Sequence, residues 1–345
     1  WIVRWVVHRA LGGGRAVAAP DWIDAADNPL GLSGFVAQYR KAVTAATPAE
    51  RERHLAGALV AAGALLHVLQ DMGSPSHVHD DLAAHARRLS DDPLDLGSRF
   101  ERIAALAFGR VAVPAPAGDV APPRSVRDLF VDGRGGGLAE WTAARFWSDG
   151  TLPRAIRVRP GQRASALAAA LAAALRAPAP APSAAELDLL AAARPGGATW
   201  RGAGGVCLAR YRIDHRRLTW WIDDDCALEQ IAALLPVTAR YSAAALDFLF
   251  RGALSLAPGR GRAVVVTNAG AALGAGTLTV LWDDARGVRT PLRAPIDVTK
   301  AAAGERLALV DELPAGARAV AVLFDGVDAN GQPVVAAGWI DLARR

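Results

Sequence analysis

The stretch LLHVLQDMGSPSHVHDD, residues 65–81, decides how this chain is interpreted. It places His67, Asp71 and His77 in the order H-x3-D-x5-H, and the four-residue spacing puts His67 and Asp71 on one helix face. Pro75 is poorly tolerated inside a helix, so the helix is predicted to end there and the chain to return His77 towards the same pocket. Imidazole and carboxylate groups are ligands that suit zinc. The stretch therefore predicts a metal site that can hold more than one ion.

These residues resemble the L-x-H-x-x-x-D-x-x-x-P-x-H core of the zinc-dependent phospholipase C and single-strand-specific nuclease superfamily. Upstream, IDAADNP at 23–29 resembles the family segment that carries a zinc-binding aspartate, which implies Asp27 as a ligand. Downstream, GSRFE at 97–101 resembles the family's H-x-x-[FY]-E element, with Glu101 in the ligand position. The resemblance covers roughly residues 1–254 and implies a divergent bacterial member of the superfamily.

The chain departs from the family pattern at two ligand positions. His54, the candidate for a histidine between Asp27 and His67, lies thirteen residues before His67, about 220 degrees round an ideal helix, and so faces away. Gly97 stands where the family's downstream element begins with histidine. The expected replacements are His79, Asp81, His85 or Asp95.

The family also uses an N-terminal tryptophan and a histidine shortly after it, which implies Trp1 and His8 as ligands. WIVRWVVHRAL at 1–11 also resembles the family's first helix beginning after that histidine, and in that interpretation neither residue holds metal.

Several of these candidates have a plain structural interpretation as well. Asp27 suits a turn at Asp-Asn-Pro, and Ser98 with Glu101 forms the pattern of a helix capping box. His77, Asp81 and His85 are spaced i, i+4, i+8, which is typical of one ligand face or of one polar helix face. The sequence leaves both interpretations open.

The basic composition is weak evidence about partners. The net charge is +5, but 37 of the 39 basic residues are arginine, and together with the alanine-rich runs this is typical of a high-GC genome. No basic cluster with interleaved aromatic residues stands out, so no stable nucleic-acid partner is expected.

The two cysteines, Cys207 and Cys226, bear on the compartment. In an exported protein they are expected to form a disulfide, and in the cytosol two buried thiols. Because the resembled family is exported, the bridge and a secreted or cell-envelope location are expected.

Two domains are expected. Residues 1–254 are predicted to form an all-α, zinc phospholipase C-like helical domain, with T-P-A-E at 47–50 as a helix start. Short Val/Leu-rich runs such as AVVVTN and TLTVLW, separated by turn residues, predict a small all-β sandwich over 258–345.

The function expected from the resemblance is zinc-dependent hydrolysis of a phosphodiester, with one to three zinc ions. A phospholipid is the first substrate choice, with peripheral membrane contact as a further expectation. Asp71 is predicted to bridge two ions and Asp27 to orient the water. The alternatives are a single-strand nuclease of the same fold and a non-catalytic protein that holds a metal.

Overall fold

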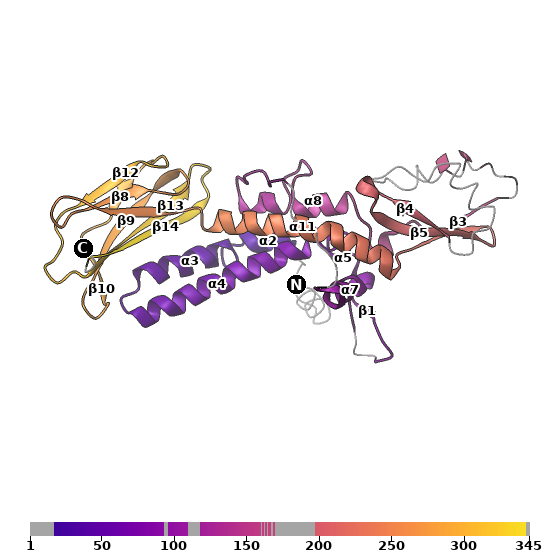
Figure 1. Ribbon diagram of the computed structural model, residues 1–345, viewed down its shortest axis with the longest axis horizontal. Coiled ribbons are helices and arrows are strands. Elements are labelled where there is room, and N and C mark those ends of the chain that lie inside the picture. The colour runs from indigo at the N-terminus through magenta and orange to yellow at the C-terminus, as the bar shows by residue number, and fades with distance from the viewer. Residues whose placement is uncertain are drawn as a thin grey trace. The chain divides into compact units, whose positions relative to one another are not determined.

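The computed structural model describes residues 17–92, 96–109, 118–159 and 197–342, together with 161, 163, 165, 166, 168 and 169 (Figure 1). The chain divides into two compact units. Unit 1 comprises the described residues up to Val68, Pro122–Asp128 and those from Ala243 onward, and unit 2 comprises Leu69–Ala121 and Leu129–Ser242.

The expected fold class, an all-α domain followed by a small β-sandwich, is wrong. The part of the chain that the structure describes is mixed, with 37% helix, 27% strand and four sheets. Two of these sheets lie within the first 254 residues, where only helices were predicted. The physical reason is that Tyr, Thr, Ile and Trp in Cys207–Trp221 favour paired strands, with alternate residues buried.

The helices of unit 1 begin with α2 (Ala19–Asp24) and α3 (Leu32–Thr44), followed by α4 (Pro48–Asp71), whose last three residues lie in unit 2. The predicted start of α4 is confirmed: Thr47 Oγ1 accepts from the Glu50 N–H at 3.3 Å, and the Glu50 carboxylate accepts from the Thr47 N–H at 3.2 Å. By length and composition α4 is apolar enough to cross a membrane, a property that core helices share.

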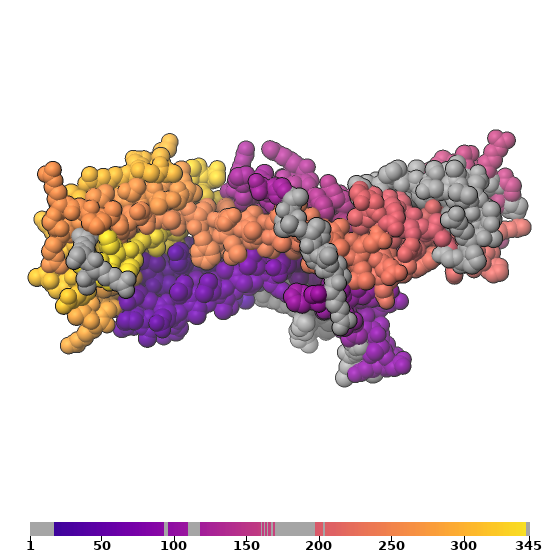
Figure 2. All heavy atoms as spheres, viewed as in Figure 1, coloured from indigo at the N-terminus to yellow at the C-terminus, as the bar shows by residue number. Residues whose placement is uncertain are grey.

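The last part of unit 1 consists of two antiparallel sheets that share one core (Figure 1). One has the order β12-β8-β7, and the other β10-β9-β13-β14 with β11 also paired to β9. The helix α3 contacts β13 and β14, and in Figure 2 indigo atoms lie against the yellow atoms of these strands. The strands are β7 (Leu254–Pro258), β8 (Val264–Asn268), β9 (Leu273–Asp283), β10 (Arg289–Pro291), β11 (Ile296–Val298), β12 (Arg306–Val310), β13 (Ala319–Asp328) and β14 (Pro333–Asp341).

A buried ion pair joins the end of a helix to these sheets. Arg251 follows α11 (Asp224–Leu249) and donates from Nε to Asp328 Oδ2 at 2.9 Å, with side-chain exposures of 12% and 5%. Asp328 Oδ1 also accepts from the backbone N–H groups of Asn330 and Gln332, at 2.8 and 2.9 Å. One carboxylate therefore fixes both the β13–β14 turn and the chain after α11.

Unit 2 is built round an antiparallel sheet with the order β3-β6-β5-β4. One face of this sheet lies in an aromatic core that contains Trp147, Trp200 and Tyr211. The strands are β3 (Ile156–Arg157), β4 (Ala198–Arg201), β5 (Cys207–Asp214) and β6 (Arg217–Trp221). The remaining elements of unit 2 are α5 (Pro75–Val78), α6 (Leu82–His85), β1 (Arg87–Arg88), β2 (Leu96–Gly97), α7 (Arg99–Ala107), α8 (Leu138–Ala143) and the short 3-10 helices Asp149–Thr151 and Ala203–Gly205. A further 3-10 helix, Val126–Leu129, has its first three residues in unit 1.

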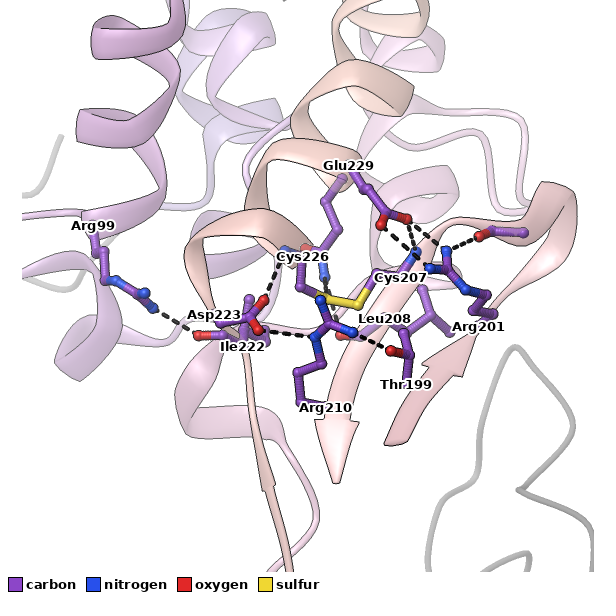
Figure 3. The surroundings of a disulfide bond; sticks show 12 residues. Arg99, Thr199, Arg201, Cys207, Leu208, Arg210, Ile222, Asp223, Cys226 and Glu229 are labelled. Carbon is purple, nitrogen blue, oxygen red and sulfur yellow. Dashed lines mark hydrogen bonds and ion pairs between the residues drawn. A yellow bond between two sulfur atoms is a disulfide. The ribbon is translucent and has the colours of Figure 1, made fainter. Parts of the chain in front are cut away.

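The disulfide Cys207–Cys226 is confirmed and joins the start of β5 to the first turn of α11 (Figure 3). The Cys207 N–H donates to Glu229 Oε2 at 2.9 Å, and the Cys226 N–H donates to Asp223 Oδ1 at 2.8 Å. Each acid is in turn paired with an arginine, Arg201 with Glu229 and Arg210 with Asp223. Both sulfur atoms are fully buried, so the bridge is part of the core.

Candidate metal centre

Three of the predicted ligands converge in unit 2. The donor atoms of His77, His85 and Glu101 all lie within 4.8 Å of one another, so this group can hold a metal ion. His77 Nε2 lies 2.9 Å from Glu101 Oε1, and His85 Nδ1 lies 3.4 Å from the same oxygen. The two imidazole rings meet edge to face, with centroids 4.3 Å apart.

Short, capped elements place these side chains. α5 begins with Pro75 in its first turn and carries His77, and α6 ends at His85. The β1–β2 hairpin then pairs Arg87 with Gly97, which returns the chain from the end of α6 to the start of α7. Glu101 lies in the first turn of α7, and its N–H donates to Ser98 Oγ at 3.2 Å. The hairpin is therefore the element that brings His85 and Glu101 together.

The site is closed on the histidine side and open on the carboxylate side. The side chains of His77 and His85 are 10% and 17% exposed, whereas that of Glu101 is 48% exposed. His85 Nδ1 is buried and has no hydrogen-bond partner among the described atoms. Burial first, and then the neighbouring His77, lower the pKa of His85, against the opposing charges of Glu101 and Asp71. Both effects favour the neutral imidazole, which is the form that binds a metal.

Two predicted replacements for missing ligands are engaged elsewhere. His79 Nε2 lies 2.7 Å from the carbonyl oxygen of Phe146. Asp81 is buried and N-caps α6, where its Oδ1 accepts from the Ala84 N–H at 3.1 Å. Its Oδ2 accepts from Ser148 Oγ at 2.6 Å and from the Gly150 N–H at 2.7 Å. Neither residue belongs to the three-donor group.

Of the three residues spaced i, i+4, i+8, only His77 and His85 come together, and Asp81 does not join them. α5 ends at Val78 and α6 starts at Leu82, with Asp80 between them in the left-handed region at φ 52°. The chain therefore turns instead of continuing one helix. His77 and His85 still meet because the two short helices pack on each other.

The other predicted ligands are distributed as follows. Asp27 lies exposed in the turn after α2, and His67 lies exposed on α4, both in unit 1. Asp71 ends α4 in unit 2, near enough that its charge acts on His85. Trp1, His8 and Asp95 lie outside the described residues. Within the described residues, the converging group is limited to His77, His85 and Glu101.

Comparison of the chain with protein-family models and with curated proteins finds no match.

Asp81→Ala is expected to lower the free energy of unfolding by about 2–3 kcal/mol, because the buried hydroxyl of Ser148 and the backbone N–H groups of Gly150 and Ala84 lose a charged acceptor. Urea denaturation followed by circular dichroism measures this change. Asp80→Ala, at an exposed neighbour, is the control, although its positive φ adds a cost of its own. A loss for Asp81→Ala no larger than that of the control would contradict the structural role.

Proposed function

We propose that this chain is an exported, zinc-dependent phosphodiester hydrolase that binds one zinc ion through His77, His85 and Glu101. The observation that carries the proposal is the convergence of two imidazoles and a carboxylate within 4.8 Å. The disulfide adds support for export, because such bonds persist in oxidising compartments.

The chemistry of the donor set fits zinc. Two histidines and one carboxylate are typical of catalytic zinc sites, which keep a fourth position open for water or substrate. Structural sites are instead closed by four protein ligands. The open side at Glu101 supports the catalytic kind of site.

A zinc ion held there would lower the pKa of a water molecule and offset charge on the phosphoryl oxygens of a substrate. The chain's own residues prepare the site. Asp81 fixes α6 and so positions His85, while Ser98 fixes the first turn of α7 and so positions Glu101. Asp71 adds negative charge close to His85, which favours a cation. The exposed side at Glu101 is where substrate can approach.

A second candidate function is a protein that holds one metal without catalysis. The small number of donors favours this second candidate, because Asp27 and His67 do not belong to the three-donor group found among the described residues. Superfamily catalysis as expected from the resemblance uses a cluster of ions, whereas this group suits one.

Zinc binding and hydrolysis should be measured on the same full-length protein. Apo-protein titrated with zinc is expected to bind one ion and to cleave bis(p-nitrophenyl) phosphate, and a chelator is expected to abolish the cleavage. His85→Ala and Glu101→Gln should each weaken zinc binding by more than about 100-fold and remove activity, since loss of an outer-shell partner alone typically costs 10–100-fold. His215→Ala, whose side chain is 94% exposed, is the matched control.

The outcomes separate the two candidates. One bound zinc with no cleavage of the model diester, phosphatidylcholine vesicles or single-stranded DNA would leave only the metal-holding protein. Zinc binding that is unchanged in His85→Ala would show that the ion is held elsewhere and would overturn both candidates.

A further inference from the structure

The face of the β3-β6-β5-β4 sheet that points away from the aromatic core is rich in arginine. Burial alternates along β5, where Tyr211 is buried while Arg212 is exposed, and Trp220, paired with Tyr211, packs on the core. The side chains on the opposite face are Arg157, Thr199, Arg201, Arg210, Arg212, Asp214, Arg217, Thr219 and Trp221. Five of these nine are arginines and one is acidic.

Sheet pairing assembles this basic face from separate segments. Arg157 of β3 lies opposite Arg217 of β6, and Arg217 in turn lies opposite Asp214 of β5. Neighbouring strands lie about 4.8 Å apart, so Arg157 and Arg217 are adjacent across the sheet, with Asp214 next in the same row. Because its arginines come from four strands, this basic face is not visible as a contiguous basic cluster in the sequence.

Charge on the face is only partly neutralised within the protein. Arg201 and Arg210 are paired with Glu229 and Asp223. Among the described residues, Arg157, Arg212 and Arg217 have no ion-pair partner. The direct pairing of Arg157 with Arg217 sets like charges opposite each other, which destabilises a sheet. An anion between these two arginines would relieve that repulsion.

The face also carries a stacking platform. The Arg212 guanidinium lies 5.6 Å from the centroid of the Trp221 ring, on the neighbouring strand. Gly197 leaves room for this ring, since a Cβ there would lie 3.0 Å from Cη2 of Trp221. Unstacked bases bind to aromatic rings and to the planes of arginine side chains in this way.

We propose that this sheet face binds single-stranded nucleic acid, with Arg157, Arg212 and Arg217 contacting phosphates and the Arg212–Trp221 stack contacting a base. The surface is distinct from the metal centre, and its binding does not depend on the proposed hydrolase activity. A membrane fits less well, because the nine residues on the face include no aliphatic side chain to enter a bilayer. A duplex fits less well, because its bases are already stacked.

Binding should be measured by fluorescence anisotropy with a labelled 20-residue oligothymidylate, with full-length protein in chelator. The triple variant Arg157→Ala/Arg212→Ala/Arg217→Ala is expected to bind at least about tenfold more weakly, and its salt dependence should fall by about 2 in slope. Arg260→Ala/Arg286→Ala/Arg293→Ala removes the same charge from exposed positions in unit 1 and should bind as wild type. Trp221→Leu should weaken binding about fivefold or more, with little change in salt slope.

Circular dichroism and thermal melting should accompany each variant, and Arg212→Gln offers a milder change if the triple variant fails to fold. The proposal is overturned if wild-type protein does not bind oligothymidylate at 50 mM salt, or if both triple variants bind equally. Equal affinity for a duplex of the same length, or preference for anionic lipid vesicles over the oligonucleotide, would also overturn it.

Discussion

Asp328→Ala is expected to lower the free energy of unfolding by about 3–5 kcal/mol, the largest stability change of any substitution considered for unit 1. The Arg251 side chain is only 12% exposed and would lose its carboxylate partner while remaining buried. The N–H groups of Asn330 and Gln332 would also lose their acceptor. Burial lowers the pKa of Arg251, and the adjacent Asp328 carboxylate opposes that shift. Equilibrium unfolding in guanidinium chloride measures the change.

Asp328→Asn distinguishes the contribution of the ion pair with Arg251 from that of the hydrogen bonds in the β13–β14 turn. Its amide oxygen can still accept from the turn N–H groups, so this variant should lose less stability than Asp328→Ala. Arg40 and Asp325 form an exposed ion pair in the same unit, and Asp325→Ala should cost at most about 1 kcal/mol. Similar losses for Asp328→Ala and Asp325→Ala would show that the Arg251 pair contributes nothing beyond a surface contact.

Removal of the disulfide has the second large expected effect. The bridge closes a loop with a sequence separation of 19, and in the chain-entropy model a loop of this size stabilises by about 3 kcal/mol. Cys207→Ala/Cys226→Ala should therefore lower the free energy of unfolding by about that amount. The ion pair of Arg201 with Glu229 still ties β4 to α11, and that of Arg210 with Asp223 ties β5 to the residue before α11, so the double variant is expected to fold.

Differential scanning calorimetry of the oxidised wild type and the double variant provides the measurement. Because both cysteines are fully buried, wild-type protein in mild reductant should keep its bond and its melting temperature, which supplies the control. A double variant that melts at the wild-type temperature would contradict a stabilising role for the bridge.

Short sequence patterns predicted the features that depend on residues close together in the chain. The Thr47–Glu50 capping box involves neighbouring groups, and α4 starts at Pro48 as that box predicts. The helix ends earlier than the predicted stop at Pro75, because α4 ends at Asp71 and Pro75 begins α5. His77, His85 and Glu101 were all among the candidates because their chemistry is visible in the sequence. Their convergence was not predictable, because it depends on a hairpin with two residues in each strand, too short to give a periodic pattern.

The sheet of unit 2 was missed because its hairpin lacks the usual turn residues. His215 and Arg216 occupy the two turn positions with φ of 42° and 64°, where glycine or asparagine is typical. Without that signal, the alternation in RYRIDHRRLTWW was not interpreted as two strands. The wrong fold class follows from this omission, since helical residues elsewhere in the first 254 positions dominate the pattern.

The three donors of the candidate metal centre lie close together along the chain, which affects how such a site would be inherited. All three donors lie within residues 77–101, in the order His-x7-His-x15-Glu, and the pairing of Arg87 with Gly97 sets where the second histidine and the glutamate stand. Insertions or deletions between Arg88 and Leu96 can therefore vary the second spacing while leaving the donors in register. A short segment of this kind can be gained, lost or moved between proteins as one unit. Homologues should then keep all three donors or none, even where the rest of the chain has diverged beyond comparison.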